Sequence, residues 1–145
     1  MIDKLTRFLI SFFYIGYIKY APGSISSLLI LIIWFFIPND VFLQLKIIII
    51  IMIFGFSLIY LHTKNISKKD PQYIVIDEIV GMLISLYLIP KVVYLYFFAF
   101  ILFRFFDIFK PSIIFRSQNL KYGVGIMVDD ILAGILTYFI VRNIY

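Results

Sequence analysis

The sequence predicts an all-α fold: a compact helical bundle, integral to the membrane, with about four to five hydrophobic helices and an N-terminal interfacial helix. The first observation behind this prediction is composition, because 63% of the residues are hydrophobic and only 14% are charged. A soluble domain is usually about half apolar and about a quarter charged. The second is the mean hydropathy of +1.06. The length of 145 residues suits one domain, so residues 1–145 are interpreted as a single domain.

The N-terminal stretch, "MIDKLTRFLISFFYIGYIKY", combines cations with an apolar run. Lys4 and Arg7 precede that run, as cations do in a secretory signal peptide, but no small-residue cleavage site follows it. We therefore expect the segment to be retained. With Lys19 at its other end and several aromatic residues between, it is typical of a helix that lies in the membrane interface.

Five apolar stretches follow the N-terminal segment. They run from Ser24 to Ile37, Phe42 to Leu61, Tyr73 to Ile89, Val92 to Phe106 and Gly125 to Val141. A membrane-spanning helix needs about 20 residues, with a lower limit of about 17. The second stretch meets this length, the third and fifth are at the limit, and the first and fourth are shorter. The number of full crossings is therefore left open.

The loops between the stretches predict the orientation in the membrane. Tight reversals at 37–40 and 89–91 alternate with longer, charged loops at 62–72 and 107–123. Strict alternation places the N-terminus and both long loops on one side, with ten of the thirteen Lys and Arg residues. Positive residues gather on the cytoplasmic side of membrane proteins. The sequence thus predicts a multi-pass protein whose charged loops face the cytoplasm.

Most of the acidic residues fall at or near this same face. They are Asp70, Asp77, Glu78, Asp107, Asp129 and Asp130. Ionisable residues at the edge of an apolar span are costly, usually face the bundle interior and indicate function. Asp77 shares a stripe with Gly81 at a step of four, a spacing that lets helices approach closely. Asp129 is stepped in the same way with Gly125 and Ala133, and Asp130 with Gly134, so either acid could face the bundle. The alternative is that these acids only cap helix N-termini.

The residue types restrict the chemistry that these acids could serve. The absence of cysteine excludes a thiolate nucleophile, and a single histidine, His62, cannot supply both a nucleophile and an acid. Clustered carboxylates suit a hard cation, Mg²⁺ or Mn²⁺. Arg104 and Lys110, the first and last residues of "RFFDIFK", suit a phosphate group, although Arg104 could instead pair with Asp107. Metal-assisted attack of water on a phosphomonoester fits these residues.

The segment "APGSISS" adds a turn before the first apolar stretch. Pro22 and Gly23 predict the turn, and Ser24, Ser26 and Ser27 are candidate caps for the helix that follows. Backbone N–H groups at such a helix start can bind phosphate. Gly23 and Ser24 are therefore candidate phosphate-binding residues, with a plain turn and cap as the alternative.

Four motifs together resemble the phosphatidylglycerophosphatase A family. "APGS", "DPQYIVIDEIVGM", "FRFFDIFKP" and "GVGIMVDDILAG" occur in the family's order and spacing, between about Tyr17 and Ile140. The chain departs from the family pattern at Ser24-Ile25-Ser26, where Thr-x-Gly is usual, and at Tyr122-Gly123, which replaces a glycine pair. The resemblance implies a Mg²⁺-dependent enzyme of the bacterial inner membrane, working in phospholipid biosynthesis. Its reaction removes the terminal phosphate of phosphatidylglycerol phosphate, giving phosphatidylglycerol and inorganic phosphate.

The resemblance also implies roles for the site residues. The expected metal ligands are Asp77, Glu78, Asp107, Asp129 and Asp130, and Glu78 could instead act as a general base. Arg104 and Lys110 would neutralise charge on the phosphoryl group, so the expected catalytic set is Asp77, Glu78, Asp107, Arg104 and Lys110. The expected partners are the lipid substrate and the bilayer. No nucleic acid is expected, and the oligomeric state is left open.

Three other functions are kept as alternatives. A CDP-alcohol phospholipid transferase is the nearest other enzyme, although its "DG" and "AR" signature is missing here. A small cation transporter would also carry inward-facing carboxylates, but near the bilayer midplane rather than at one surface. A non-catalytic membrane scaffold would need no metal and would tolerate the loss of Asp107.

Overall fold

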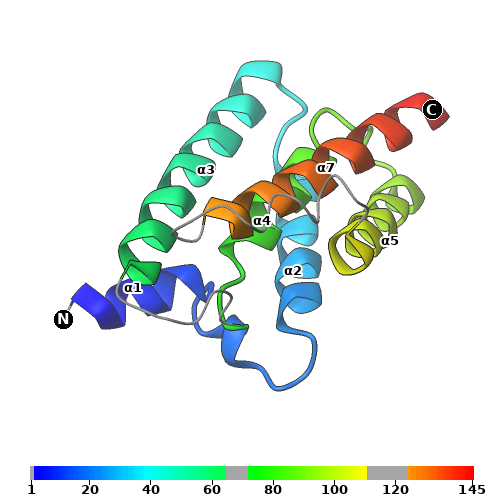
Figure 1. Cartoon of the computed structure of the whole chain (residues 1–145). Coiled ribbons are helices and arrows are strands. Elements are labelled where there is room, and N and C mark those ends of the chain that lie inside the picture. The colour runs from blue at the N-terminus through cyan, green and yellow to red at the C-terminus, as the bar shows by residue number, and fades with distance from the viewer. Residues whose placement is uncertain (1, 65–71, 111–123) are drawn as a thin grey trace.

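The computed structural model describes residues 2–64, 72–110 and 124–145, and all regular structure in these three ranges is helical (Figure 1). The elements are α1 (Ile2–Ile10), the 3₁₀ helix η1 (Ile15–Tyr17), α2 (Pro22–Phe36), α3 (Val41–Thr63), α4 (Ile76–Ser85), α5 (Val93–Phe109) and α7 (Val124–Ile144). The predicted all-α fold is confirmed. Asp70 and most of the two long charged loops, residues 65–71 and 111–123, lie outside the described residues.

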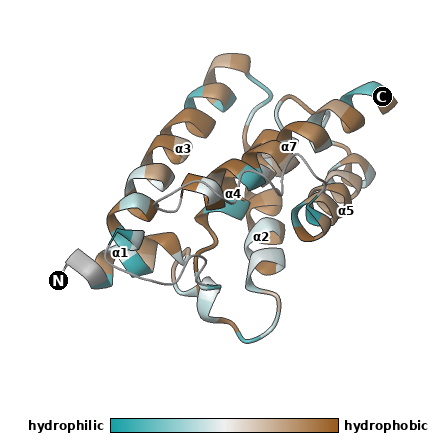
Figure 2. Ribbon diagram, viewed as in Figure 1, coloured by the Kyte–Doolittle hydropathy of each residue, from teal (hydrophilic) through white to brown (hydrophobic). Residues whose placement is uncertain are grey.

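Two helices of the described ranges are long and apolar enough to cross a membrane. They are α3, with 23 residues, and α7, with 21. Only 28% of the most apolar window of α3 is buried by the rest of the protein, so most of its side chains need another apolar environment. In Figure 2, most of the ribbon of this helix has the colour of hydrophobic residues. The helices α2 and α5 are shorter, with 15 and 17 residues, than a full crossing usually requires.

Helix α4 is much shorter than the apolar stretch that contains it. Its 10 residues rise about 15 Å, half of the hydrocarbon thickness of about 30 Å. The stretch 73–89 is interrupted after Ser85 by a turn in which Leu88 has a φ of 53°. Eight of the ten residues are buried, and α4 packs against α2, α3, α5 and above all α7. It is therefore a core helix of the bundle, and its apolar character serves protein packing.

Two glycines allow α4 and α7 to cross at close range. A Cβ added to Gly81 would lie 2.7 Å from the Asp130 carbonyl oxygen, and one added to Gly134 would lie 3.1 Å from the Gly81 Cα. The hydroxyl of Ser85 donates to the Gly81 carbonyl at 2.9 Å. The small-residue stripes predicted beside Asp77 and Asp130 are thus confirmed as the packing face of the two helices. Each glycine lies one turn from an acid, so the close crossing brings the acids together.

The N-terminal segment packs beside the start of α4. Helix α1 contacts α3, and the Val75 amide donates a hydrogen bond to the Ile10 carbonyl at 2.9 Å. The turns around η1 expose several aromatic side chains, with Phe13, Tyr14 and Tyr20 more than half exposed. Aromatic rings of this kind favour the membrane–water interface. The interfacial placement of this segment stays a prediction.

The start of α2 corrects the predicted serine caps. The N-cap position is Ala21, with a φ of 46°, and no side chain caps this helix. Pro22 begins the helix because its φ is already helical and its missing N–H is not needed there. The serines are therefore inside the helix, where the Ser26 hydroxyl donates to the Gly23 carbonyl at 2.9 Å.

The predicted tight reversals are both present. Between α2 and α3, the Asp40 carboxylate caps α3 by accepting a hydrogen bond from the Leu43 amide at 2.7 Å. Asn39 donates to the Ile89 carbonyl at 3.2 Å, which ties this turn to the one between α4 and α5. Both turns therefore lie at the end of the bundle opposite to the N-terminus of α4.

Candidate functional site

A polar cavity of about 380 Å³ opens where α2 and α4 begin, where α5 ends, and beside the second turn of α7. Its lining is Lys19, Ala21, Pro22, Gly23, Gln72, Ile74, Asp77, Glu78, Arg104, Asp107, Lys110, Ile126, Asp129 and Asp130. The cavity brings together all seven charged residues predicted from the sequence, and Gly23 with them. Ser24 is not part of the lining.

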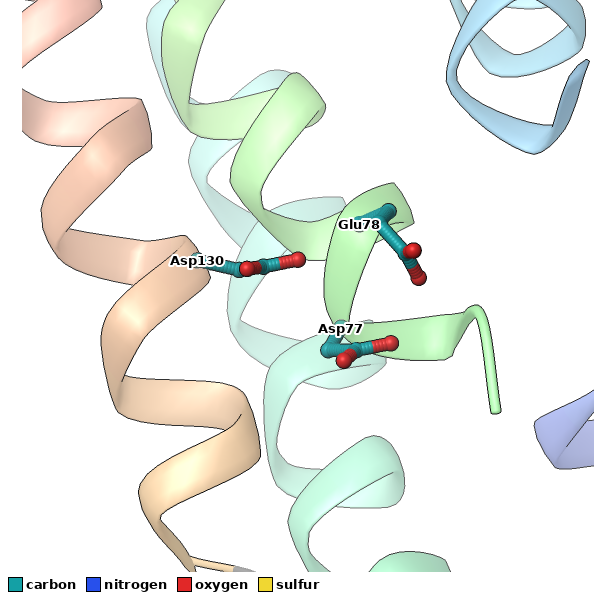
Figure 3. A group of neighbouring side chains, drawn as sticks. All are labelled: Asp77, Glu78 and Asp130. Atoms are coloured by element: carbon teal, nitrogen blue, oxygen red, sulfur yellow. The ribbon is translucent and has the colours of Figure 1, made fainter. Parts of the chain in front are cut away.

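Three of the carboxylates form a compact cluster between α4 and α7. One oxygen each of Asp77, Glu78 and Asp130 lies within 4.8 Å of the others. Figure 3 shows Asp130 extending from α7 toward the first turn of α4, which carries the other two. Asp77 and Asp130 are buried, with 7% and 3% exposure. The cluster is thus shielded from bulk water on most sides.

Helix N-termini explain only part of this arrangement. Asp77 and Glu78 occupy the first turn of α4, where the helix dipole stabilises negative charge. Asp129 and Asp130 are the sixth and seventh residues of α7, whose first turn carries no acid. The alternative that both acid pairs only cap helix N-termini is therefore wrong for α7, because the dipole effect is confined to the first turn.

The other two carboxylates are paired with cations. Arg104 Nη1 lies 2.6 Å from Asp107 Oδ2, one helical turn along α5, and 3.9 Å from Glu78 Oε1. Lys110 Nζ donates to Asp129 Oδ2 at 2.6 Å. The ion pair kept as the alternative for Arg104 is thus present. Both cations nevertheless line the cavity, so a bound phosphate would meet them beside the carboxylate cluster.

The surroundings shift the pKa of Glu78 and that of Lys110. Burial raises the pKa of Glu78 to about 7; the hydrogen bond with Asp77 opposes this shift and the charge of Asp107 adds to it. Burial lowers the pKa of Lys110, but the hydrogen bond to Asp129 and the surrounding carboxylates outweigh it and raise the pKa overall. Lys110 is therefore held as a cation, whereas ionised Glu78 lacks sufficient compensation within the protein.

The cluster fits a hard divalent cation. In the cluster, the buried oxygens Glu78 Oε2 and Asp130 Oδ2 have no hydrogen-bond partner among the described residues. A buried polar atom without a partner costs about 1–3 kcal/mol, and more if it is charged. Carboxylate oxygens without nitrogen or sulfur ligands are the donors that Mg²⁺ prefers. A cation at this cluster would satisfy both oxygens and offset the charge that burial opposes.

Gly23 allows the start of α2 to reach the site. A Cβ at this position would lie 2.8 Å from Glu78 Cδ and 3.1 Å from Arg104 Nη1. A side chain here would therefore displace the Glu78 carboxylate. Gly23 is needed for the packing of the site whether or not its amide contacts a phosphate.

Two residues of the lining, Lys19 and Gln72, are not among the predicted site residues. The sequence pattern indicates only an interfacial role for Lys19, because nothing in it signals the turn at Ala21 that brings Lys19 to the cavity. His62, the single histidine, is outside the lining, and its Nε2 forms a hydrogen bond with the Tyr73 hydroxyl at 2.6 Å. The Tyr73 ring stacks on that of Tyr17 at 5.1 Å, so this group joins the end of α3 to the edge of the site.

Comparison with known proteins agrees with the motifs. Residues 8–145 match the family described as Phosphatidylglycerophosphatase A. A Bacteroides thetaiotaomicron protein named "Putative phosphatidylinositol-3-phosphatase" is 36% identical, over 87% of this chain and 84% of its own length. Proteins named Phosphatidylglycerophosphatase A from Haemophilus influenzae and Escherichia coli are 36% and 34% identical. The matches cover 87% and 83% of this chain and 80% and 74% of theirs. No solved structure matches the chain. The chain belongs to the phosphatidylglycerophosphatase A family.

Proposed function

We propose that this protein is a Mg²⁺-dependent lipid phosphatase that hydrolyses the terminal phosphate of phosphatidylglycerol phosphate. The observation that carries the proposal is the single cavity in which Asp77, Glu78 and Asp130 cluster beside Arg104 and Lys110. These are the groups that metal-assisted phosphate hydrolysis needs: oxygen ligands for a cation and positive side chains for the phosphate. Membership of the family supplies the substrate.

The charges of the cavity support the metal requirement. Its lining carries five carboxylates and three cations, so with every group ionised the cavity has a net charge of −2. A phosphomonoester is itself nearly dianionic at neutral pH. Substrate and cavity would repel each other unless a divalent cation neutralised the carboxylates. The site therefore depends on a bound cation for substrate binding as well as for chemistry.

Each charged side chain in the cluster and its two ion pairs has a separate role in the proposed hydrolysis. Asp77, Glu78 and Asp130 would hold the cation, which when bound would lower the pKa of the attacking water and withdraw charge from the phosphoryl oxygens. Arg104 and Lys110 stabilise the negative charge on the transferring phosphoryl group. Asp107 and Asp129 orient these two cations through their ion pairs. The attacking water gives up its proton to a cluster carboxylate, and the glycerol oxygen leaves with a proton from solvent.

The geometry suits a substrate that stays in the bilayer. Helices α3 and α7 cross the membrane, the protein is multi-pass, and the cavity opens at the cytoplasmic face of a bacterial inner membrane. The exposed aromatic residues around η1 lie at the level of the lipid headgroups. Only the headgroup then has to enter the cavity, while the acyl chains remain in the hydrocarbon.

Family membership favours this reaction over the transferase, transporter and scaffold alternatives. The name of the Bacteroides relative suggests a second candidate substrate, phosphatidylinositol 3-phosphate, which also carries a phosphomonoester on its headgroup. The assay should therefore compare lipids.

The test is phosphate release by detergent-purified protein from phosphatidylglycerol phosphate, phosphatidylinositol 3-phosphate and phosphatidic acid, each with Mg²⁺ and with excess chelator. We expect Mg²⁺-dependent release that is fastest with the first lipid and is abolished in Asp77→Asn. Asp40→Asn is the matched control, because Asp40 caps α3 at the other end of the bundle and Asn caps equally well. Release that is insensitive to the chelator, or equal in Asp77→Asn, would contradict the proposal.

A further inference from the structure

We infer that Lys19 binds the phosphodiester of the substrate, and so selects lipids that carry a diester in addition to the terminal phosphomonoester. The inference rests on the proposed function and adds a second anion subsite to it. It starts from the difference between Lys19 and the other two cations of the cavity. Arg104 and Lys110 each lie 2.6 Å from a carboxylate oxygen.

Lys19 is the cation of the lining without such an ion pair. Within the described ranges, no carboxylate lies within ion-pair distance of its ammonium group, which is 5.6 Å from the centre of the Tyr20 ring. The side chain is exposed, whereas Arg104 and Lys110 are partly buried. An exposed lysine at the rim of a cavity keeps its positive charge available for a ligand.

The position of Lys19 matches the order of groups in the lipid. The carboxylate cluster lies deep in the cavity, Lys19 is at its rim, and the exposed rings of Tyr17 and Tyr20 flank Lys19 along the chain. In phosphatidylglycerol phosphate, the terminal monoester is followed by one glycerol, then by the phosphodiester, and then by the acylated glycerol at the membrane. When the monoester is at the cluster, the diester is therefore the group that reaches the rim.

The backbone brings Lys19 to this position by an unusual path. Tyr14 and Ala21, on either side of the segment, have left-handed backbone conformations, with φ of 67° and 46°. Between them the chain turns through η1, and it then enters α2 at Pro22 and Gly23, against Glu78. The rim lysine is thus connected to the deep site by three residues. Its flexible four-carbon stem suits a point-charge contact with a monoanion.

The test separates the two phosphates of the substrate by using ligands that carry only one of them. Phosphatidylglycerol has the diester alone, inorganic phosphate mimics the monoester alone, and each is measured as an inhibitor of phosphatidylglycerol phosphate hydrolysis in mixed micelles. Binding of dihexanoyl phosphatidylglycerol is also measured directly by calorimetry, which does not require turnover. The variants are Lys19→Ala, Lys19→Arg, and Lys64→Ala as the control. Lys64 is an exposed lysine at the end of α3 that is outside the cavity lining.

For Lys19→Ala we expect a KM for phosphatidylglycerol phosphate raised about tenfold at unchanged kcat, since one charge-assisted hydrogen bond is lost from ground state and transition state alike. Phosphatidylglycerol should bind and inhibit about tenfold more weakly, while inhibition by phosphate stays within twofold. Lys19→Arg should restore most of the affinity, and Lys64→Ala should resemble the unmodified protein.

Unchanged binding of the short-chain phosphatidylglycerol in Lys19→Ala would overturn the inference, as would an equal loss of phosphate inhibition. Failure of the proposed function has a different signature. In that case the unmodified protein would release no phosphate, and calorimetry would still show whether the diester is bound through Lys19.

Discussion

Replacing Glu78 with glutamine should stabilise the cation-free protein while impairing the enzyme. A pKa raised from 4.5 to about 7 means that ionised Glu78 opposes folding by about 3 kcal/mol. The cost is absent below pH 4.5, where the carboxyl is protonated in both the folded and the unfolded chain. It develops between pH 4.5 and 7 and is complete above pH 7, because there the folded state must also ionise. Glutamine keeps the shape and stays neutral at every pH.

The assay is thermal unfolding in detergent, followed by the fluorescence of Trp34, which is the only tryptophan and is buried in the core. With chelator at pH 8, Glu78→Gln should melt above the unmodified protein by about 2–4 °C for each kcal/mol gained, or about 6–12 °C for the full 3 kcal/mol. At pH 4.5 the two proteins should melt together. Asp40→Asn serves as the acid-to-amide control and should show no such pH-dependent difference.

Mg²⁺ should reverse the order of the two proteins. It stabilises whatever state binds it, so the unmodified protein should gain several degrees while Glu78→Gln gains little. A variant that melts below the unmodified protein at pH 8 in chelator would refute the reasoning, because ionised Glu78 would then be a net stabilising group. An equal response of both proteins to Mg²⁺ would remove Glu78 from the cation site.

Two further predictions concern the glycines that position the site. Gly134→Ala should destabilise the fold by about 1–3 kcal/mol and lower activity at least tenfold, because its Cβ would push α7 away from Gly81 and separate Asp130 from α4. Gly55→Ala is the control: its Cβ would lie 3.2 Å from Met127 Cε and 3.3 Å from Ile76 Cγ1, with no backbone atom among its nearest contacts, so both losses should be smaller than for Gly134→Ala. Gly23→Ala should reduce activity more than stability, since its Cβ displaces the Glu78 carboxylate at the surface of the cavity. Activity and melting temperature of purified variants check both predictions, and unimpaired activity in either glycine variant would contradict the packing described here.

The sequence predicted the site better than it predicted the helices around it. Steps of four residues from Asp77 to Gly81 and from Asp130 to Gly134 indicated the packing face of α4 and α7, since small residues at that spacing have few other uses in an apolar helix. The division of the five carboxylates was predictable only in part. The spacing of three residues already indicated that Arg104 could pair with Asp107 on the same helix. The pairing of Lys110 with Asp129 depends on where the end of α5 meets α7, and this is a tertiary property.

Hydropathy also could not distinguish a helix surrounded by lipid from one surrounded by protein. The stretch 73–89 is apolar enough for either, and only the structure shows that α4 ends after ten residues with nearly all of them buried. Lys19 was missed for a related reason. Its approach to the cavity depends on the left-handed turn at Ala21, and alanine gives no sequence signal for that conformation.

The most direct test of the central claim is cation binding by the α4–α7 carboxylate cluster. Mn²⁺ can replace Mg²⁺ at oxygen sites, and its electron paramagnetic resonance signal distinguishes free from bound ions. Titration of the detergent-purified protein should show Mn²⁺ bound in competition with Mg²⁺, with an affinity at least tenfold lower in Asp130→Asn and unchanged in Asp40→Asn. Equal Mn²⁺ affinity in Asp130→Asn and the unmodified protein would contradict the assignment of this cluster as the metal centre.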